Sequence, residues 1–126
     1  GFMSYTHVFI MNRLLAASEE VKAEAAKLDR AYSMVFELGN GPRGETVWWD
    51  MRFDPEAGVS FSLQEPSAPG DLTLKGDYAT YINFLKGMVA GEVPRDAQEP
   101  VTSVGDPGVV ETVAAVFAAS QKVKSP

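Results

Sequence analysis

The 126-residue chain contains no cysteine and a single histidine, His7. Without cysteine it forms no disulfide, offers no thiolate nucleophile and binds no metal through sulfur. A lone histidine without partners at defined spacing gives no basis for a metal site or an acid–base relay. The sequence therefore predicts no catalytic residues, no metal site and no cofactor, and we expect a protein that is not an enzyme.

Basic residues are also scarce, because 11 Lys and Arg stand against 17 Asp and Glu, a formal net charge of −6. Nucleic acids and anionic lipid surfaces both attract basic patches, so neither is an expected partner. No apolar run approaches the ~20 residues that span a bilayer. Residues 8–11 are too short for the core of a signal peptide. These features, with the lack of cysteine, favour a cytoplasmic protein without integral membrane association.

Two patterns look like functional motifs but have simpler explanations. Residues 39–44 match G-x-G-x-x-G, yet a proline lies inside the match and a strand is expected after it. The dinucleotide motif needs a helix N-terminus there to meet the pyrophosphate, so we interpret these residues as a turn. Asp50, Asp54 and Glu56 lie on a strand and a turn without a calcium-loop pattern. We interpret them as a solvated rim.

The most informative segment covers residues 71–87. Leu72 and Leu74 alternate with polar neighbours, as on a half-buried strand. Gly76 and Asp77 are expected to break this strand, with Asp77 capping the helix that follows. The helix carries a broad apolar stripe that consists of Tyr78, Ile82, Leu85 and Met88, with Tyr81 and Val89 beside it. A strand that leads into an aromatic-rich helix can roof a sheet and enclose apolar space.

Hydrophobic periodicity divides the remaining chain into two further helices and four further strands. The helices are expected over residues 12–31 and from Asp106-Pro107 to about residue 122. The strands are expected over residues 33–38, 46–53, 59–63 and 100–104. Three successive strands with short turns imply an antiparallel meander. The predicted fold class is α+β, in the order α-β-β-β-β-α-β-α, as one domain over residues 1–126 with residues 1–11 as an N-terminal extension.

The aromatic residues leave two interpretations open. Trp48 and Trp49 are adjacent on a strand, so they face opposite sides of the sheet. Both could pack within the monomer, or one could be covered by the N-terminal helix region, a partner chain or a ligand. A second group forms either part of the core or the wall of a pocket for apolar ligands. It consists of Tyr78, Tyr81, Phe84, Met88 and Phe117.

Residues 71–87 resemble the sterol carrier protein 2 (SCP2) domain. That family shows an acidic residue, a short strand with Thr between aliphatic residues, a turn, an aromatic-bearing helix and a Gly-containing exit. Further similar strings are V-F-E-L at 35–38, W-W-D-M at 48–51 and V-G-D at 104–106. The order of these elements over residues 14–123 is similar to that of small free-standing bacterial members with an extended N-terminal helix.

The resemblance implies a five-stranded, mostly antiparallel sheet with helices over one face and a hydrophobic tunnel between them. It also implies noncatalytic binding and transfer of an apolar ligand such as a fatty acid, an acyl-CoA or a sterol-like molecule. If the inward faces of strands and helices meet, the tunnel is lined by Trp49, Met51, Phe61, Tyr81, Phe84, Leu85, Met88 and Phe117.

One segment departs from the family pattern. Between the second helix and the last strand, family members carry an amphipathic segment that helps to wall the tunnel. Residues 93–104 are shorter, more polar and contain two prolines. The alternative hypothesis is therefore an SCP2-like interaction module with a reduced cavity, which forms a homodimer or docks to a partner protein.

Overall fold

The computed structural model describes residues 4–94 and 96–123. Its elements are α1 (Tyr5–Ala17), α2 (Glu19–Ala25), β1 (Tyr32–Gly39), β2 (Val47–Asp54), β3 (Gly58–Ser62), β4 (Leu72–Asp77), α3 (Tyr78–Val89), β5 (Val101–Gly105), α4 (Val109–Thr112) and α5 (Ala114–Gln121). The strands form one five-stranded sheet in the order β3-β2-β1-β4-β5. Only the β1–β4 pair is parallel among the described strands. The predicted α+β class and mostly antiparallel sheet are confirmed.

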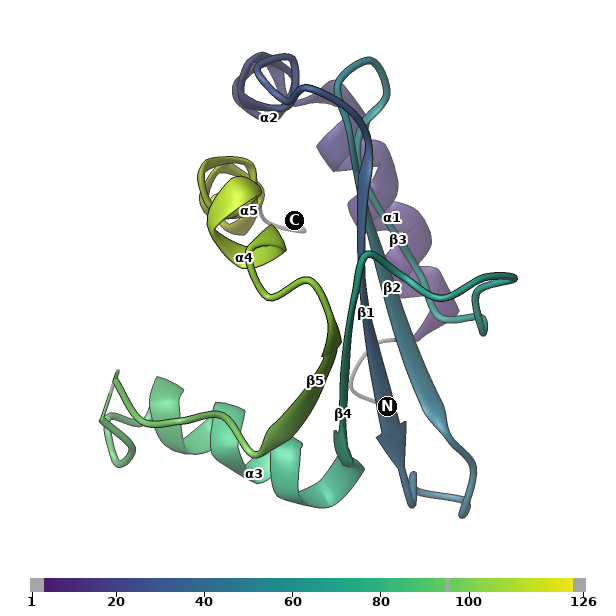
Figure 1. Ribbon diagram of the computed structural model, residues 1–126, viewed down its shortest axis with the longest axis vertical. Helices are drawn as coiled ribbons and strands as arrows, with labels where there is room; N and C mark the ends of the chain where they lie inside the picture. The colour runs from purple at the N-terminus through teal and green to yellow at the C-terminus, as the bar shows by residue number, and fades with distance from the viewer. Residues whose placement is uncertain (1–3, 95, 124–126) are drawn as a thin grey trace.

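The helices are distributed unevenly around the sheet (Figure 1). Helices α2, α4 and α5 lie over one face, and α3 runs outward from the end of β4 on the same side. The core between these helices and the sheet includes Phe53, Leu38 and Leu72 from the strands, with Val21 and Val116 from α2 and α5. This arrangement leaves α3 in contact with the sheet mainly through its first turns.

Helix α1 covers the free edge of the sheet at β3. The amide Nδ2 of Asn12 donates to the carbonyl of Phe61 at 2.8 Å, and Oδ1 of Asn12 accepts from the Phe61 N–H at 2.8 Å. The side chain thus satisfies both backbone groups that a neighbouring strand would otherwise use. Because unpaired strand edges promote association, this contact also blunts the edge.

The single N-terminal helix expected over residues 12–31 is wrong, because the structure has two helices that meet at Ser18. The Ser18 backbone is extended (φ −77°, ψ 116°), and its Oγ accepts from the Val21 N–H. A serine hydroxyl that caps a new helix competes with continuation of the old one. Helix α2 then ends at Ala25, and residues 26–31 form a turn region.

The expected strand break at Gly76 is also wrong, since β4 continues to Asp77. A Cβ on Gly76 would lie 2.9 Å from the Pro100 carbonyl, so glycine allows the chain of β5 to approach closely. Asp77 does cap α3, as predicted, by accepting from the Thr80 N–H. The hydrogen bond from Asn40, with those from Thr80, lowers the pKa of Asp77 below its ordinary value.

The last predicted helix is divided as well. It begins at Val109 rather than at Pro107, and it is split into α4 and α5 at Val113. Asp106 lies in the preceding turn, where its Oδ1 accepts from the Gly108 N–H at 2.8 Å. Hydrogen bonds from Val113 to Val109 and from Phe117 to Val113 keep the two short helices nearly continuous.

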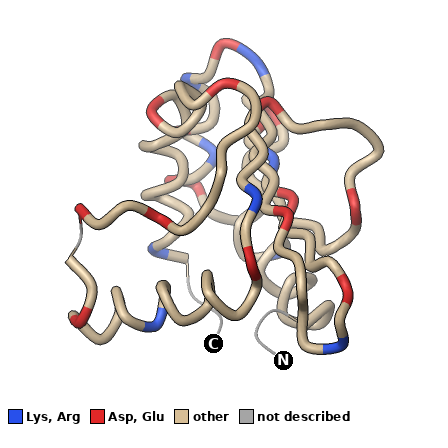
Figure 2. The backbone as a smooth tube through the Cα atoms, turned by 60° about the horizontal axis from the view of Figure 1, so that its bottom comes forward, with Lys and Arg blue, Asp and Glu red and all other residues tan. Residues whose placement is uncertain are grey.

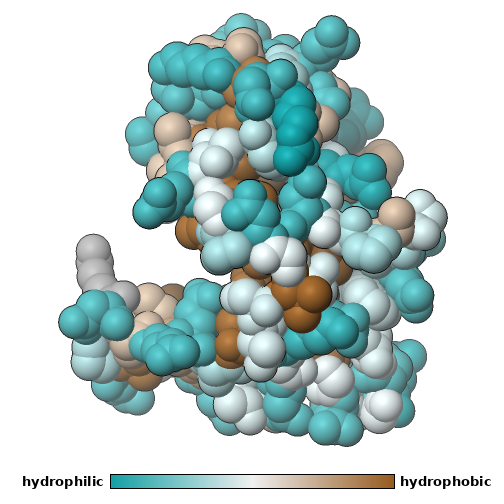
Figure 3. Space-filling model, viewed as in Figure 1, coloured by the Kyte–Doolittle hydropathy of each residue, from teal (hydrophilic) through white to brown (hydrophobic). Residues whose placement is uncertain are grey.

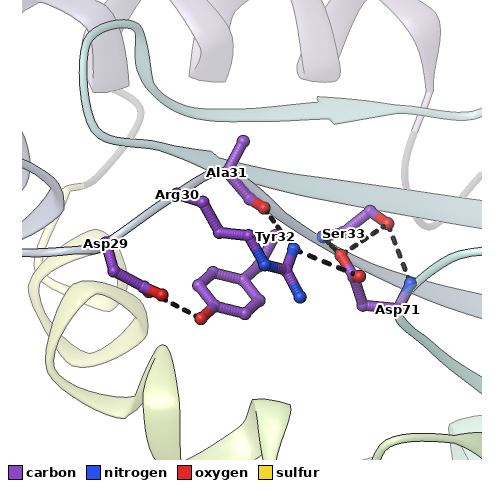
Figure 4. A network of polar contacts seen from close by, with 6 residues as sticks. All are labelled: Asp29, Arg30, Ala31, Tyr32, Ser33 and Asp71. Carbon is purple, nitrogen blue, oxygen red and sulfur yellow. Dashed lines mark hydrogen bonds and ion pairs between the residues drawn. The ribbon is translucent and has the colours of Figure 1, made fainter.

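A polar network fixes the parallel pairing of β1 with β4 (Figure 4). The Ser33 N–H donates to Asp71 Oδ2 at 2.8 Å, and the Asp71 N–H donates to Ser33 Oγ at 3.0 Å. The guanidinium of Arg30 lies 3.2 Å from Asp71 Oδ1 and stacks over the Tyr32 ring at 4.0 Å. The Tyr32 hydroxyl donates to Asp29, which lowers the pKa of that carboxyl. Asp71, directly before β4, therefore links this strand to Ser33 on β1, 38 residues earlier in the chain.

Candidate functional site

An apolar cleft of about 500 Å³ lies between the helix-covered face of the sheet, α3 and the α4–α5 pair. We call it the α3–α5 cleft. Its lining residues are Met34, Phe36, Leu74, Tyr81, Leu85, Met88, Glu99, Val110, Val113, Ala114, Phe117 and Ala118. Figure 3 shows the surface hollowed between the projecting α3 arm and the body of the molecule, with hydrophobic atoms at the hollow. The cleft opens to solvent and is not a closed tunnel.

Strand register builds the floor of the cleft. Phe36 on β1 lies opposite Trp49 on β2 and beside Leu74 on β4, so the three side chains share the helix-covered face. The Phe36 ring lies 5.7 Å from that of Trp49 and 5.3 Å from that of Tyr81. Tyr81 in turn stacks on Phe84 at 6.2 Å. This aromatic cluster anchors the first half of α3 on the sheet.

The second half of α3 extends away from that anchor. Tyr81 and Ile82 are buried, Leu85 and Met88 are half-buried, and Val89 is 91% exposed. The outer side of α3 forms a further apolar hollow, whose lining includes Ile82, Leu85 and Met88. Leu85 and Met88 thus lie at the open side of the α3–α5 cleft, where one wall is a helix with few supporting contacts.

Two side chains supply the polar character of the cleft, Tyr81 and Glu99. Burial is the main cause that raises the pKa of the Tyr81 hydroxyl, and the charge of Glu99 and a hydrogen bond to its carboxylate add to the rise. Tyr81 therefore stays protonated at neutral pH and can donate to the Glu99 carboxylate.

No family model matches this sequence, and no curated protein matches it. Solved structures do match. The solution structure of a conserved hypothetical protein from Thermus thermophilus is 17% identical, with a TM-score of 0.57 over 100% of this chain and 93% of that one. Sterol carrier protein 2 from Yarrowia lipolytica, in its apo form, is 21% identical, with a TM-score of 0.54 over 100% of this chain and 95% of that one.

The chain has the sterol carrier protein 2 fold. The SCP2-like element order predicted from the sequence is thereby confirmed, apart from the two divided helices.

Four of the eight predicted lining residues lie on the wall of the α3–α5 cleft of this SCP2 fold. They are Tyr81, Leu85, Met88 and Phe117. Of the others, Phe84 is half-buried against Tyr81, outside the cleft lining. Trp49 and Met51 lie on the helix-covered face of the sheet and are buried in the core, outside the cleft lining. That all eight residues contact a ligand remains a prediction.

The eighth residue, Phe61, lies elsewhere. It lines a separate hollow of about 160 Å³ between α1 and the end of α5, together with Val8 and Met11. Its strand is at the edge of the sheet, opposite the edge strand β5. Phe61 shares the helix-covered face with Met51 but is too far along the sheet to line the α3–α5 cleft.

Sequence reasoning missed several lining residues. The alternation of apolar residues along their strands predicts an inward face for Met34, Phe36 and Leu74. Only the parallel register of β1 with β4 shows that Phe36 lies beside Leu74. Val113 lies at the junction of α4 and α5 and is buried. No sequence pattern indicates Glu99, because it belongs to the irregular segment before β5.

The opposite face of the sheet carries Trp48. It is half-buried and borders two shallow hollows, one of about 360 Å³ under residues 65–70 and one of about 400 Å³ that Tyr5 also lines. On the same face Asp50 is only 4% exposed, so its interpretation as a solvated rim residue is wrong. Its Oδ2 lies 3.4 Å from Arg52, while no protein partner is found for its buried Oδ1.

Residues 4–94 and 96–123 contain no group of three or more His, Asp or Glu side chains placed to hold a metal ion. His7 lies in the first turn of α1, where its backbone N–H donates to Ser4 Oγ. No helix in the same part of the chain is both long and apolar enough to cross a bilayer.

Proposed function

We propose that this protein binds a lipid or another small apolar molecule in the α3–α5 cleft and transfers it without chemical change. The observation that carries the proposal is the composition of the cleft, whose lining is apolar apart from Tyr81 and Glu99. A volume of about 500 Å³ lies within the usual range of about 300–1,000 Å³ for small-ligand sites. Burial of each methylene of an acyl chain could contribute about 0.8 kcal/mol.

The same lining supports a noncatalytic role. A nucleophile needs a neighbouring base, and general acid–base catalysis needs a group whose pKa lies near the working pH. The pKa of Tyr81 is instead raised, away from neutrality. The cleft therefore offers apolar contact area and one polar pair, Tyr81 and Glu99, which suits binding and release.

The open side of the cleft supports exchange of the ligand. Leu85 and Met88 are half-buried there, and Val89 beyond them is exposed. A fatty acid, an acyl-CoA or a sterol-like molecule would place its apolar part against Phe36, Leu74 and these side chains. The similar Yarrowia lipolytica structure is described as sterol carrier protein 2, which favours the same ligand class.

A cleft-filling variant tests the proposal. Ala114 and its neighbour Ala115 are both exposed, but only Ala114 lines the cleft. Ala114→Trp is expected to weaken binding of an uncharged fluorescent probe and of the apolar ligands that displace it. Ala115→Trp is expected to leave the binding of both unchanged. Native mass spectrometry of protein purified from cells should show an additional apolar mass. Absence of probe binding by the unmodified protein, or equal binding by both variants, would contradict the proposal.

A second candidate function is the interaction module, favoured by the outer face of α1. Tyr5, Phe9 and Ile10 are 69%, 63% and 38% exposed there. An apolar helical face of this kind can bury itself in a homodimer or against a partner protein. Light scattering across a range of concentrations tests the homodimer, since Phe9→Glu should abolish any self-association. A mass that stays monomeric at all concentrations would exclude it.

A further inference from the structure

Among the described residues that line the α3–α5 cleft, Glu99 is the only charged one. The residue belongs to the irregular segment between α3 and β5, where its backbone carbonyl accepts a hydrogen bond from the Val101 N–H of β5 at 2.9 Å. It lines the cleft beside Tyr81, which is almost fully buried and whose hydroxyl pKa is raised in part by the Glu99 charge. A negative charge therefore lies where an otherwise apolar cleft ends.

The surroundings do not neutralise this charge with a described cation. The segment after α3 also carries Glu92 and Asp96, and Figure 2 shows acidic positions along this arm. The described cation of the arm is Lys86 on α3, which lines the outer hollow of that helix and not the cleft. The protein as a whole has a formal charge of −6. Among the described residues, the cleft lining and the segment after α3 thus carry more acidic than basic side chains.

We propose that the α3–α5 cleft selects amphiphiles whose polar end is an uncharged or cationic hydrogen-bond donor, and disfavours carboxylates. The proposal rests on the proposed function, because it assigns a head-group preference to the same cleft. A hydroxyl or ammonium group placed beside Glu99 donates to the carboxylate, and hydrogen bonds to a charged acceptor are the stronger kind. Glu99 is an exposed residue at the rim of the cleft, so a fatty-acid carboxylate placed beside it would meet a like charge whose repulsion weakens as ionic strength rises.

Glu99 and Tyr81 have distinct parts in this selection. Tyr81 and Glu99 line the cleft together, and the Glu99 carboxylate is close enough to help to raise the pKa of the Tyr81 hydroxyl. Additional acceptor positions on the carboxylate remain for a ligand donor, because two carboxylate oxygens accept about four hydrogen bonds. Glu99 would contact the ligand directly, whereas Tyr81 would be a positioning residue.

Three ligands with one chain length test the proposal: dodecanol, dodecylamine and dodecanoate at pH 7.5. Each is titrated against the full chain that carries an uncharged fluorescent probe. Dodecanol and dodecylamine are expected to bind at least tenfold more tightly than dodecanoate, which corresponds to ~1.4 kcal/mol. Glu99→Gln removes the charge and keeps the shape, and it should bring dodecanoate within about threefold of dodecanol. Glu111→Gln, at an exposed position outside the cleft, is the control and should leave the ratio unchanged.

The outcomes separate the two proposals. Dodecanoate that binds as tightly as dodecanol, or a preference that survives Glu99→Gln, overturns the head-group selection while ligand binding in the cleft stands. Failure of all three ligands to displace the probe overturns the proposed function, and the selection with it. Circular dichroism of the Glu99→Gln variant confirms that the fold is unchanged.

Discussion

Replacement of Asn12 by leucine should destabilise the protein even though it improves the helix in which the residue lies. The Asn12 amide makes two hydrogen bonds of 2.8 Å to the N–H and C=O of Phe61, across 49 residues of sequence. Leucine has a similar size and a higher helix propensity, so neither steric change nor loss of helicity explains a decrease in stability. The variant isolates the two bonds that attach α1 to the edge of the sheet.

The expected cost follows from those two contacts. Each net hydrogen bond contributes about 1 kcal/mol, and the backbone groups of Phe61 lose a partner in a partly buried position. We expect Asn12→Leu to lower the free energy of unfolding by about 2 kcal/mol, which is a decrease in Tm of roughly 8 °C for a chain of this length.

Urea denaturation followed by circular dichroism, together with thermal melting, measures this change. Arg13→Leu is the matched control, because Arg13 is exposed on the same helix and its change should stay within about 0.5 kcal/mol. An Asn12→Leu variant as stable as the unmodified protein, or an Arg13→Leu variant that is equally destabilised, would refute the role given to the amide.

Two further predictions concern β4 and its cap. Gly76→Ala places a Cβ about 2.9 Å from the Pro100 carbonyl, so hydrogen exchange in β5 should accelerate, whereas Gly39→Ala, whose Cβ would lie 4.0 Å from the nearest backbone oxygen, should leave exchange unchanged. Equal exchange in both variants would contradict the close approach. Because hydrogen bonds lower the pKa of Asp77, its carboxylate stabilises the fold at neutral pH and loses this contribution as the pH falls below about 4. Asp77→Asn keeps the cap but should reduce the drop in urea midpoint between pH 7 and pH 3, and an undiminished drop would contradict this linkage.

Local sequence patterns predict those features of the fold that depend on residues adjacent in the sequence. Alternation identifies the inward faces of β1, β2 and β4, and Asp77 is recognisable as a cap from residue type and spacing. The break at Ser18 does not follow from the apolar pattern, because the helical stripe continues on both sides of it. Its signal is the Ser18 hydroxyl itself, followed by two glutamates in the first turn of α2.

The cleft depends on contacts that no local pattern encodes. Tyr81, Leu85 and Met88 follow from the helical period, but Leu74 joins them only through the parallel pairing of β4 with β1. Register along a sheet also decides which inward residues are buried beneath the cleft and which line it. Glu99 reaches the cleft by the path of an irregular segment, and such paths are set by tertiary packing.

The location of a bound ligand can be measured directly through the methionine methyl groups. Met34 and Met88 line the α3–α5 cleft, whereas Met11 lines the separate hollow beside α1. In ¹³C-methyl-methionine NMR spectra, a dodecanol titration is expected to shift the signals of Met34 and Met88 and to leave that of Met11 in place. Unchanged Met34 and Met88 signals at saturating ligand, or a shift confined to Met11, would contradict binding in the α3–α5 cleft.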